Sequence, residues 1–375
     1  MQKIFYLSEI SLPNTSAQVI QILKMCDSFS DKKKEVYLLV NHNENLKFFN
    51  LKKKYNLKTN FKIISLKNNK NLSFLRRINL ANKAIRYISL FKDNNKIVIS
   101  RSIISSIIFS IFGKKNILEL HSENSGISRI LFNFFRKTGA FKNQFFILIH
   151  KNLNKHFKFD NKKFIILDDA VDIEDFKFKK KIKKIKNSCV YTGSFYKGKG
   201  VEFIFELSKI LPKVKFYLYG DINTLDDRFK NNKQNKNLIF RNHIEYSQIP
   251  KTLAKFEIIL MPYSKKVYVK SKSIEVGQYM SPLKLFDYLA SGKILIASEH
   301  ENYKHILIDK INCFLLNLNQ TYLWKEKIED IFLYNNNNKL IKNIKSKALA
   351  TAQKHTWKKR TTKIINFINR NKIYD

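Results

Sequence analysis

The stretch KIFYLSEISLPNTSAQVIQILKMCDSFSDKKKEVYLLV, residues 3–40, decides the fold class. Its ends, Lys3–Leu7 and Val36–Val40, are short and nearly continuous apolar runs, and Ser16–Phe29 between them has apolar residues at helical spacing. Strand, helix and strand in this order, with strands apolar on both faces, are typical of a parallel sheet that helices cover on both sides. This stretch therefore predicts an α/β fold.

The same alternation continues to residue 167 and starts again at residue 188. We expect further strands at 61–65, 97–100, 116–120, 145–149, 164–167, 188–193, 215–220, 238–240, 257–262, 293–298 and 313–316. We expect helices at 75–91, 103–112, 127–137, 201–211, 247–255, 281–291 and 302–309, and only helices after residue 319. Two successive sets of βα units predict two Rossmann-like, doubly wound domains.

The length agrees with this organisation, since 375 residues at about 150 per domain give about two domains. The lysine-dense stretch FKFKKKIKKIKN, Phe176–Asn187, marks a linker. We therefore expect an N-terminal domain over 1–175, the linker at 176–187, a C-terminal domain over 188–355 and a final helix over 356–375.

The net charge of +41, from 71 basic and 30 acidic residues, favours an anionic partner: nucleic acid, an anionic membrane surface or phosphorylated substrates. The alternative is that an AT-rich genome enriches lysine codons and the excess only keeps the chain soluble. The lysine-dense linker does not look like a nucleic-acid arm, which would interleave aromatic residues and arginine. Nucleic acid is therefore the least favoured partner.

Cysteine usage and hydropathy favour a cytoplasmic chain. The three cysteines, Cys26, Cys189 and Cys313, are scattered without disulfide or metal-ligand spacing, which favours a reducing compartment. The first residues do not resemble a signal peptide. The longest apolar stretch, Ser102–Phe112, is shorter than the roughly 20 residues that a bilayer requires. Such a chain could still dock on a membrane surface.

The segment SPLKLFDYLASGKILIAS, residues 281–298, predicts a helix with an anion site at its start. Ser281 is a good N-cap, and Pro282 suits the first helical position because its missing N–H costs nothing there. The free N–H groups of Leu283 and Lys284 then point out of the helix start, with the Lys284 ammonium beside them. Together these groups suit a phosphate.

Asp287 lies one turn further along this helix, on the same face as Lys284. A carboxylate there suits a pair of vicinal hydroxyls, such as those of a ribose. The alternative is a capped core helix on whose surface Lys284 and Asp287 pair at positions i and i+3. The residues alone leave both interpretations open.

The segment SCVYTGSFYKGKGVEFIF, Ser188–Phe205, predicts a second phosphate-binding element. A strand ends at Gly193, a loop follows, and a helix begins near Lys199–Gly200, which is where doubly wound sheets bind phosphates. Lys199 could reach a pyrophosphate. The alternative is a plain turn with surface lysines, because the dinucleotide spacing G-x-G-x-x-G is missing.

Together these segments resemble the donor half of GT-B glycosyltransferases, most closely glycosyltransferase family 4. The resemblance rests on Gly193 followed by Lys199–Gly200, on the strand IILMPY at 258–263 with its Pro262, and on the helix that ends in Ala-x-Gly-Lys before residue 294. LDDAVDIEDF at 167–176 resembles the segment before the interdomain linker, and TWKKR at 356–360 resembles the start of a final helix that crosses back to the first domain. The resemblance implies two domains facing a cleft.

The N-terminal half resembles the capsule and lipopolysaccharide branch of that family. PNTSAQVIQILKM at 13–25 is similar to its first strand-to-helix loop, and Arg101 and Glu119-x-His121 fall where the family has Arg-Ser and an acidic-x-His pair. The resemblance implies that His121 contacts the transferred sugar and that the acceptor side includes Asn14, Thr15, Ser16, Arg101 and Glu123. The alternatives are an ordinary loop histidine and a solvated loop carboxylate at 123.

Two positions depart from the family pattern. The usual arginine beside the loop glycine is Ser194 here, and the family's two glutamates, which have seven residues between them, correspond to Tyr279 and Asp287. Lys284, in the Ser-Pro-x-Lys sequence, can take over part of the missing positive charge.

The resemblance implies a retaining enzyme that transfers a sugar from a nucleotide diphosphate sugar to a hydroxyl of a glycan or lipid-linked glycan, in surface polysaccharide biosynthesis. The expected catalytic residues are His121, Lys199 and Lys284. The expected donor-binding residues are Gly193, Ser194, Lys199, Pro262, Tyr279, Ser281, Leu283, Lys284 and Asp287. We expect no cofactor and no metal, because the chain has no Asp-x-Asp triplet and no ligand-like histidine spacing.

Expected partners are the donor, the glycan acceptor and the anionic inner face of the cytoplasmic membrane. The alternatives are a transferase that has lost turnover, a polyanion-binding protein, and a sugar-nucleotide epimerase of the same architecture.

Overall fold

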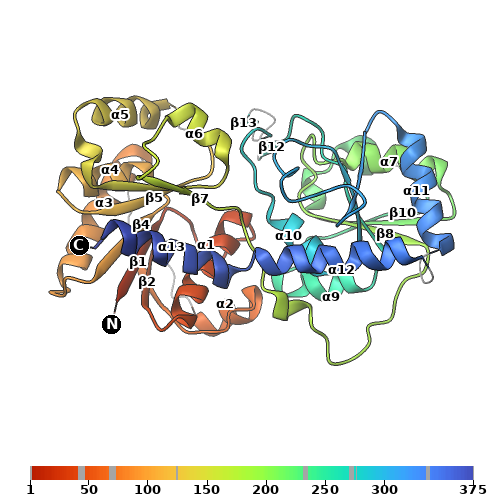
Figure 1. Ribbon diagram of the computed structural model, residues 1–375, viewed down its shortest axis with the longest axis horizontal. Coiled ribbons are helices and arrows are strands. Elements are labelled where there is room, and N and C mark those ends of the chain that lie inside the picture. Colours follow the sequence, from red (N-terminus) through yellow and green to blue (C-terminus); the bar gives the residue numbers. More distant parts are fainter. Residues whose placement is uncertain are drawn as a thin grey trace. The chain divides into compact units, whose positions relative to one another are not determined.

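A computed structural model describes residues 2–40, 47–66, 73–123, 126–230, 235–269, 274–275, 277–334 and 338–374. The chain forms two compact units (Figure 1). The first comprises Met1–Asp169 and Trp357–Asp375, and the second comprises Ala170–Thr356. The chain therefore passes from the first unit to the second and returns for its last helix.

The first unit contains a parallel sheet of seven strands in the order β3-β2-β1-β4-β5-β6-β7. The strands are β1 Lys3–Ser8, β2 Glu35–Val40, β3 Lys62–Ser65, β4 Lys96–Ser100, β5 Asn116–Leu120, β6 Gln144–Leu148 and β7 Phe164–Ile166. The helices are α1 Ala17–Asp31, α2 Phe48–Tyr55, α3 Ser73–Ser89, α4 Ile103–Ile111, α5 Gly126–Lys137, α6 Lys151–Phe157 and α13 Trp357–Asn371.

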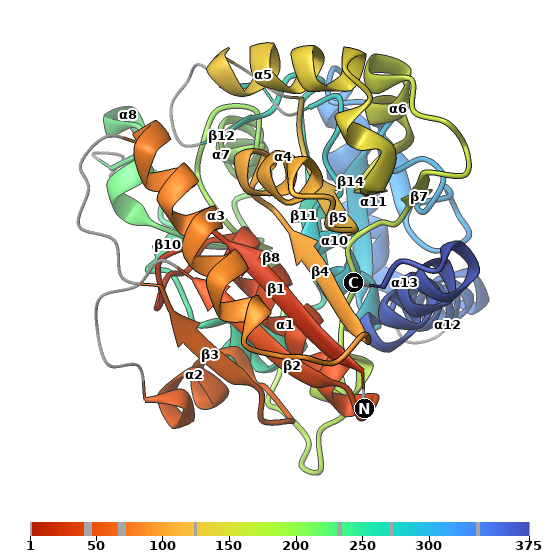
Figure 2. The same cartoon turned by 90° about the vertical axis from the view of Figure 1, so that its left-hand side faces the viewer.

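Alternate residues of the central strands face opposite helical layers. Phe5 and Leu7 of β1 pack in a core with residues of α3 and α4, whereas Tyr6 points to the other face of the sheet. Figure 2 shows α3 and α4 on one side of β1 and β4, with α1 on the other. Helix α13 packs on α1, and Ser28 and Thr361 share a hydrogen bond of 2.9 Å between the two helices.

The second unit contains a parallel sheet of six strands in the order β10-β9-β8-β11-β14-β15. The strands are β8 Ser188–Thr192, β9 Lys215–Tyr219, β10 Leu238–Arg241, β11 Ile258–Met261, β14 Ile294–Ser298 and β15 Phe314–Leu316, beside an antiparallel pair β12 Tyr268–Val269 and β13 Ile274–Glu275. The helices are α7 Val201–Ile210, α8 Asp227–Lys230, α9 Ile249–Ala254, α10 Leu283–Ala290, α11 Thr321–Tyr334 and α12 Lys339–Lys354.

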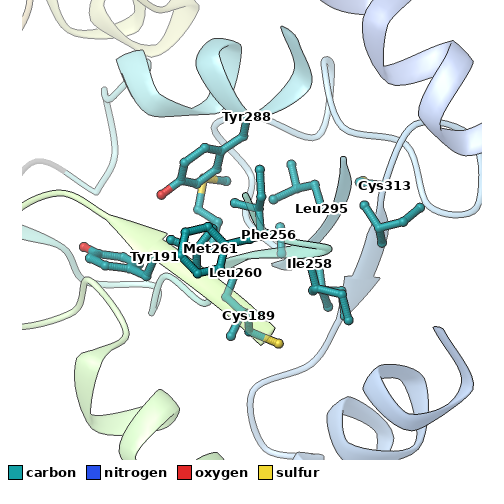
Figure 3. Packing of buried hydrophobic residues seen from close by; sticks show 14 of the residues in the cluster. Cys189, Tyr191, Phe256, Ile258, Leu260, Met261, Tyr288, Leu295 and Cys313 are labelled. Atoms are coloured by element: carbon teal, nitrogen blue, oxygen red, sulfur yellow. The ribbon is translucent and has the colours of Figure 1, made fainter. Parts of the chain in front are cut away.

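The core of the second unit lies around β8 and β11. Figure 3 shows Tyr288 of α10 directed toward Met261 at the end of β11. The Tyr288 hydroxyl accepts a hydrogen bond from the Thr192 N–H at 2.9 Å and donates one to the Thr192 carbonyl at 3.0 Å, which fixes α10 to the end of β8. The strand order reverses between β8 and β11, as it does between β1 and β4, and such switch points are where doubly wound sheets bind ligands.

The two doubly wound sheets confirm the predicted fold class, but the helix predicted at 302–309 is wrong. Tyr303, Ile306 and Leu307 are buried with helical spacing, yet the N–H groups of Ile306 and Leu307 both bond to the Tyr303 carbonyl in a succession of turns. The Asn302 side chain donates a hydrogen bond to the Gly277 carbonyl and so does not cap a helix. Helices α2, α6 and α8 and strands β12 and β13 are additional to the predicted elements.

The chain passes into the second unit earlier than the predicted boundary at residue 175. Residues from Ala170 onward belong to the second unit. Phe176 and Ile185 pack against its core, and the Ile185 N–H donates to the Lys255 carbonyl at 2.8 Å. The lysine-dense segment 176–187 is thus anchored in the second unit by its apolar residues. Helices α11 and α12 also belong to that unit, and α13 belongs to the first.

All three cysteines are buried free thiols. Among the described residues, no helix is long and apolar enough to cross a membrane.

Candidate active site

The loop after β8 lies tightly against two neighbouring segments of the second unit. Gly193 has φ +133°, and a Cβ there would lie 2.3 Å from Lys284 Nζ. Gly200, with φ +91°, precedes α7, and a Cβ there would lie 2.3 Å from the Pro262 carbonyl oxygen. Only glycine fits these positions. The loop is thereby held beside the end of β11 and the start of α10.

The ammonium groups of Lys284 and Lys199 converge on the same aromatic ring. Lys284 Nζ lies 3.9 Å from the ring centroid of Tyr191 and 5.3 Å from that of Tyr263. Lys199 Nζ lies 5.6 Å from the Tyr263 centroid. The Lys284 Nζ is buried and has no hydrogen-bond partner among the described residues. The structure therefore brings together Gly193, Lys199 and Lys284, with aromatic rings beneath the two charges.

Burial lowers the pKa of Lys199 to about 8. Burial also holds the pKa of Lys284 well below its ordinary value, and the charge of Lys199 acts in the same direction. A buried ammonium is costly when its hydrogen-bonding capacity is unused. An anion of two or more charges placed here would relieve both the desolvation and the mutual repulsion.

The start of α10 differs from the prediction. Pro282, with ψ 117°, is the N-cap residue, so it precedes the helix and Ser281 does not cap it. Proline provides no side-chain acceptor, so the first turn has no side-chain cap. The prediction had placed proline one residue too far inside the helix. The start of α10 remains beside the Lys284 ammonium.

Asp287 does not pair with Lys284. It is buried, and its Oδ1 accepts a hydrogen bond from the Tyr246 hydroxyl at 3.1 Å. Tyr246 begins a short 3-10 helix, Tyr246–Gln248, between β10 and α9. The surface i, i+3 ion pair is therefore excluded as the role of Lys284. Asp287 is held by a hydroxyl donor on one side of α10, while Lys284 turns toward β8.

The other predicted donor residues also belong to the second unit. Pro262 is buried at the end of β11, and the Ser194 carbonyl accepts from the Tyr191 hydroxyl at 2.7 Å. Leu283 is buried in the first turn of α10. Tyr279 and Ser281 are half-buried on the segment that leads into α10.

Glu119 is the centre of a buried polar cluster in the first unit. Its carboxylate accepts hydrogen bonds from Tyr6 Oη at 2.5 Å, Gln21 Nε2 at 2.6 Å and Arg360 Nη2 at 2.6 Å, and lies 2.9 Å from His121 Nε2. Burial by itself raises the pKa of Glu119. The charge of Arg360 and the hydrogen bond from His121 outweigh burial and hold the pKa well below its ordinary value.

His121 follows β5 directly and is neutral at pH 7. Burial lowers its pKa to about 4, the charge of Arg101 acts in the same direction, and the Glu119 carboxylate opposes both. An ionised carboxylate only accepts hydrogen bonds, so we assign the ring hydrogen to Nε2. Nδ1 is then left as an acceptor, suited to a sugar hydroxyl.

The loop between β1 and α1 is held by its own hydrogen bonds. Ser16 caps α1 by accepting from the Val19 N–H, and Asn14 Oδ1 accepts from the Ser16 N–H at 2.8 Å. The Asn14 carbonyl accepts from the Tyr55 hydroxyl at 2.5 Å, and Thr15 is exposed. This arrangement gives Asn14 and Ser16 clear roles in shaping the loop.

Arg101 and Glu123 lie at the carboxyl ends of β4 and β5. Arg101 Nη1 donates to Gln21 Oε1 at 3.0 Å, so it joins the cluster around Glu119. Glu123 instead lies 3.4 Å from His156 Nδ1 of α6. The structure thus brings His121 and Arg101 together, and it places Glu123 in an interaction with His156.

The aromatic residues Tyr191 and Tyr263 and the ion pair of Glu119 with Arg360 were not among the predicted site residues. Tyr191 and Tyr263 lie within apolar strand patterns, which predict core positions. Glu119 could have been found from the sequence, because it is a charged residue within the apolar strand NILEL. Arg360 could not, because it stands in a run of basic residues.

Residues 199–366 match the family of glycosyl transferase-like domains. The matched segment includes Lys199, Lys284 and Asp287 and continues into α13. No curated protein is significantly similar to the chain in sequence.

The chain is also similar over nearly its whole length to solved glycosyltransferases. It is 15% identical to a glycosyltransferase from Rickettsia africae, with a TM-score of 0.71. The match covers 98% of this chain and 99% of that one. It is 11% identical to HepE from Anabaena in complex with UDP and glucose, with a TM-score of 0.68 and coverages of 98% and 100%. WaaG, a glycosyltransferase involved in lipopolysaccharide biosynthesis, is 11% identical, with a TM-score of 0.61 and coverages of 97% and 99%.

The two doubly wound parallel sheets give the chain the GT-B fold of these solved glycosyltransferases. The chain carries a glycosyl transferase-like domain over 199–366, which confirms the resemblance drawn from its donor-half motifs.

Proposed function

We propose that this glycosyltransferase transfers a sugar from a nucleoside diphosphate sugar to a hydroxyl of a glycan or lipid-linked glycan, with retention of anomeric configuration and without a metal. The observation that carries the proposal is the pair of buried ammonium groups, Lys199 and Lys284, at the switch point of the second sheet. The UDP and glucose bound by HepE, and the role of WaaG in lipopolysaccharide biosynthesis, support a nucleotide sugar donor and a surface glycan product.

In the proposed reaction, the bond from the anomeric carbon to the β-phosphate oxygen breaks, and a bond to the acceptor oxygen forms. The leaving nucleoside diphosphate gains negative charge, and its β-phosphate oxygen takes up the proton of the acceptor hydroxyl. Lys199, Lys284 and the N-terminus of α10 stabilise this charge, which is typically the largest electrostatic contribution to such a reaction. Lys284 lies beside Gly193 and so supplies positive charge next to Ser194, where related enzymes have arginine.

Asp287 and His121 complete the proposed roles. Asp287, oriented by the Tyr246 hydroxyl, accepts hydrogen bonds from the donor's hydroxyls. His121, with Nδ1 free to accept, contacts a hydroxyl of the transferred sugar. The remaining donor residues, Ser194, Tyr279, Ser281 and Leu283, shape the site around the donor, and Asn14, Thr15, Ser16, Arg101 and Glu123 serve the acceptor side.

The proposed function is tested by incubating the purified chain with a panel of nucleotide sugars and measuring nucleotide release with and without a lipid-linked glycan acceptor. Release that the acceptor accelerates supports transfer. Binding of UDP or GDP without turnover would instead support a decayed transferase. Epimerised donor without nucleotide release would support an epimerase, and binding of RNA alone would support a polyanion-binding protein.

We predict that transfer continues in excess EDTA. Among the described residues, no group of three or more His, Cys, Asp and Glu side chains is placed to hold a metal ion, and the two ammonium groups supply the charge that a divalent ion would otherwise supply. The measurement compares nucleotide release before and after chelation. Complete loss of activity that manganese restores would contradict the metal-free mechanism.

We further propose that the enzyme docks at the cytoplasmic face of the membrane through α5 of the first unit. Ile127, Ile130 and Phe134 are exposed and lie on one stripe of this helix, at positions i, i+3 and i+7. Arg136 and Lys137 lie in its last turn. An exposed apolar stripe beside basic residues fits an anionic lipid surface, where each basic residue contributes about 1 kcal/mol. A lipid-linked acceptor would be presented at that surface.

We predict that the chain binds anionic vesicles at low salt and dissociates as salt rises, because salt screens the attraction to the lipid charge. Replacing Phe134 by aspartate in α5 should weaken co-sedimentation with such vesicles at least several-fold. Leu333→Asp, at an exposed apolar position of α11 in the second unit, is the matched control and should have no effect. Equal binding to neutral vesicles, or no binding to either kind at low salt, refutes electrostatic docking.

A further inference from the structure

We propose that Arg360 is a positioning residue: from the first turn of α13 it holds the Glu119 carboxylate that determines which nitrogen of His121 carries the hydrogen. This extends the proposed function, on which the catalytic use of His121 rests. The arrangement itself can be tested without any substrate.

The guanidinium of Arg360 joins two separate segments of the first unit. Its Nη2 donates to Glu119 Oε1 at 2.6 Å, and its Nη1 donates to the carbonyls of Leu167 and Asp168 at 2.9 Å and 3.0 Å. The Arg360 side chain is 3% exposed and that of Glu119 is 0% exposed. Because the guanidinium is planar and rigid, the carbonyls that hold one nitrogen also fix the direction of the other.

One oxygen of Glu119 connects Arg360 to His121. Oε1 accepts from Arg360 Nη2 and lies 2.9 Å from His121 Nε2. With Arg360 in place, the Glu119 carboxylate stays ionised and its Oε1 stays directed at His121 Nε2. Without Arg360, the carboxylate can rotate toward Tyr6, and His121 is then free to exchange its hydrogen between Nε2 and Nδ1.

The position of Arg360 depends on the return of the chain to the first unit. Leu167 and Asp168 come just before Asp169, the residue at which the chain leaves the first unit. Helix α13 begins at Trp357, the residue at which the chain returns to that unit. Arg360 therefore joins residues that precede the second unit in the sequence to the helix that follows it.

Several charged groups act on His121 and must be included in its titration. Glu119 of β5 favours the protonated ring, whereas Arg101 after β4 and Arg360 of α13 disfavour it. Tyr6 of β1 faces Glu119. Asp169, whose pKa burial raises to about 7, faces Arg360. Removal of Arg360 should therefore raise the pKa of His121, because a positive charge that repels the imidazolium is lost.

The first test is the tautomer of His121, read from ¹H–¹⁵N spectra of the full chain labelled with ¹⁵N-histidine, with His121→Gln assigning the signal. We expect the neutral Nε2–H tautomer at pH 7 in the wild type. In Arg360→Gln we expect a mixture of both tautomers and a titration midpoint at higher pH. Arg370→Gln, exposed on the same helix, should match the wild type. An unchanged His121 signal in Arg360→Gln overturns the proposal.

The second test is turnover, with UDP-glucose as the probe donor and UDP release as the readout. We expect Arg360→Gln to lower kcat by on the order of tenfold or more, with KM for the donor nearly unchanged. Arg360→Lys keeps the charge but cannot reach both Glu119 and the carbonyls. Its kcat should therefore lie between that of Arg360→Gln and that of the wild type. If Arg360→Gln does not fold, a wild-type tautomer and kcat in Arg360→Lys assign Arg360 a purely structural role and overturn the proposal. A wild-type chain without turnover counts against the proposed function, while the His121 spectra still test Arg360.

Discussion

Replacing Lys284 by alanine should lower the rate of sugar transfer by on the order of 10² or more, and Lys199→Ala should have an effect of the same order. Each substitution removes a positive charge from the place where the departing diphosphate gains negative charge. Both kcat and the affinity for the donor should fall. Because the two ammonium groups act on one ligand, the double variant should lose less than the product of the two single effects.

Lys284→Met separates the charge from the packing of this side chain. Methionine fills a similar volume beside Gly193 and Tyr191 without an ammonium group. We expect its activity to fall as in Lys284→Ala. Its thermal stability should equal or exceed that of the wild type, since a buried charge with no hydrogen-bond partner among the described residues is removed.

Lys209→Ala is the matched control for this prediction. Lys209 is an exposed residue of α7 that pairs with Glu206 at 2.9 Å, and it should retain normal transfer. Normal activity in both Lys199→Ala and Lys284→Ala would show that the phosphate site is assigned wrongly.

Glu119→Gln should have the largest effect on stability. The substitution leaves the buried Arg360 guanidinium without its carboxylate, and breaking a buried pair in this way costs about 3–5 kcal/mol. For a unit of this size, that loss lowers Tm by about 10 °C. Thermal unfolding followed by circular dichroism at pH 7 measures it, with Glu123→Gln, a partly exposed residue of the same unit, as the control.

The effect of Glu119→Gln should depend on pH. The pKa of Glu119 is depressed in the folded chain, so its stabilising contribution is fully present above the unfolded-state value of about 4.3 and is lost as pH falls through the lower folded value. The difference in Tm between variant and wild type should therefore narrow in acid. If the free energy of unfolding of Glu119→Gln at pH 7 lies within about 1 kcal/mol of the wild-type value, the cluster contributes little to stability.

Hydrophobic spacing predicted most of the strands and helices because each strand is apolar along both faces. The same spacing failed at 302–309, where buried residues with helical spacing are carried by turns. The spacing of apolar residues predicts which side chains are buried. It does not predict whether the backbone between them forms helical hydrogen bonds or turns. The prediction of Ser281 as a cap failed for a similar reason, since Pro282 can stand before a helix as well as at its first position.

The sequence brought Gly193, Lys199 and Lys284 into one prediction because each stands where a strand of the second sheet gives way to a helix. The tyrosine rings beneath the lysines could not be predicted, because aromatic residues in apolar strands have the same pattern whether they line a site or fill a core. Arg360 could not be predicted either. Its contact with Glu119 spans most of the chain and depends on the return of α13 to the first unit.

The measurement that tests the central claim most directly is calorimetric binding of UDP, and of GDP if UDP does not bind, at pH 8 in two buffers of different ionisation enthalpy. Lys199 and Lys284 have lowered pKa values in the free chain, and a bound diphosphate should raise them again. Binding should therefore take up protons, and the affinity should fall as pH rises above about 8. Lys199→Ala should bind more weakly and take up fewer protons. Binding that exchanges no protons and is unchanged in Lys199→Ala and Lys284→Ala would contradict the assignment of the diphosphate to these two lysines.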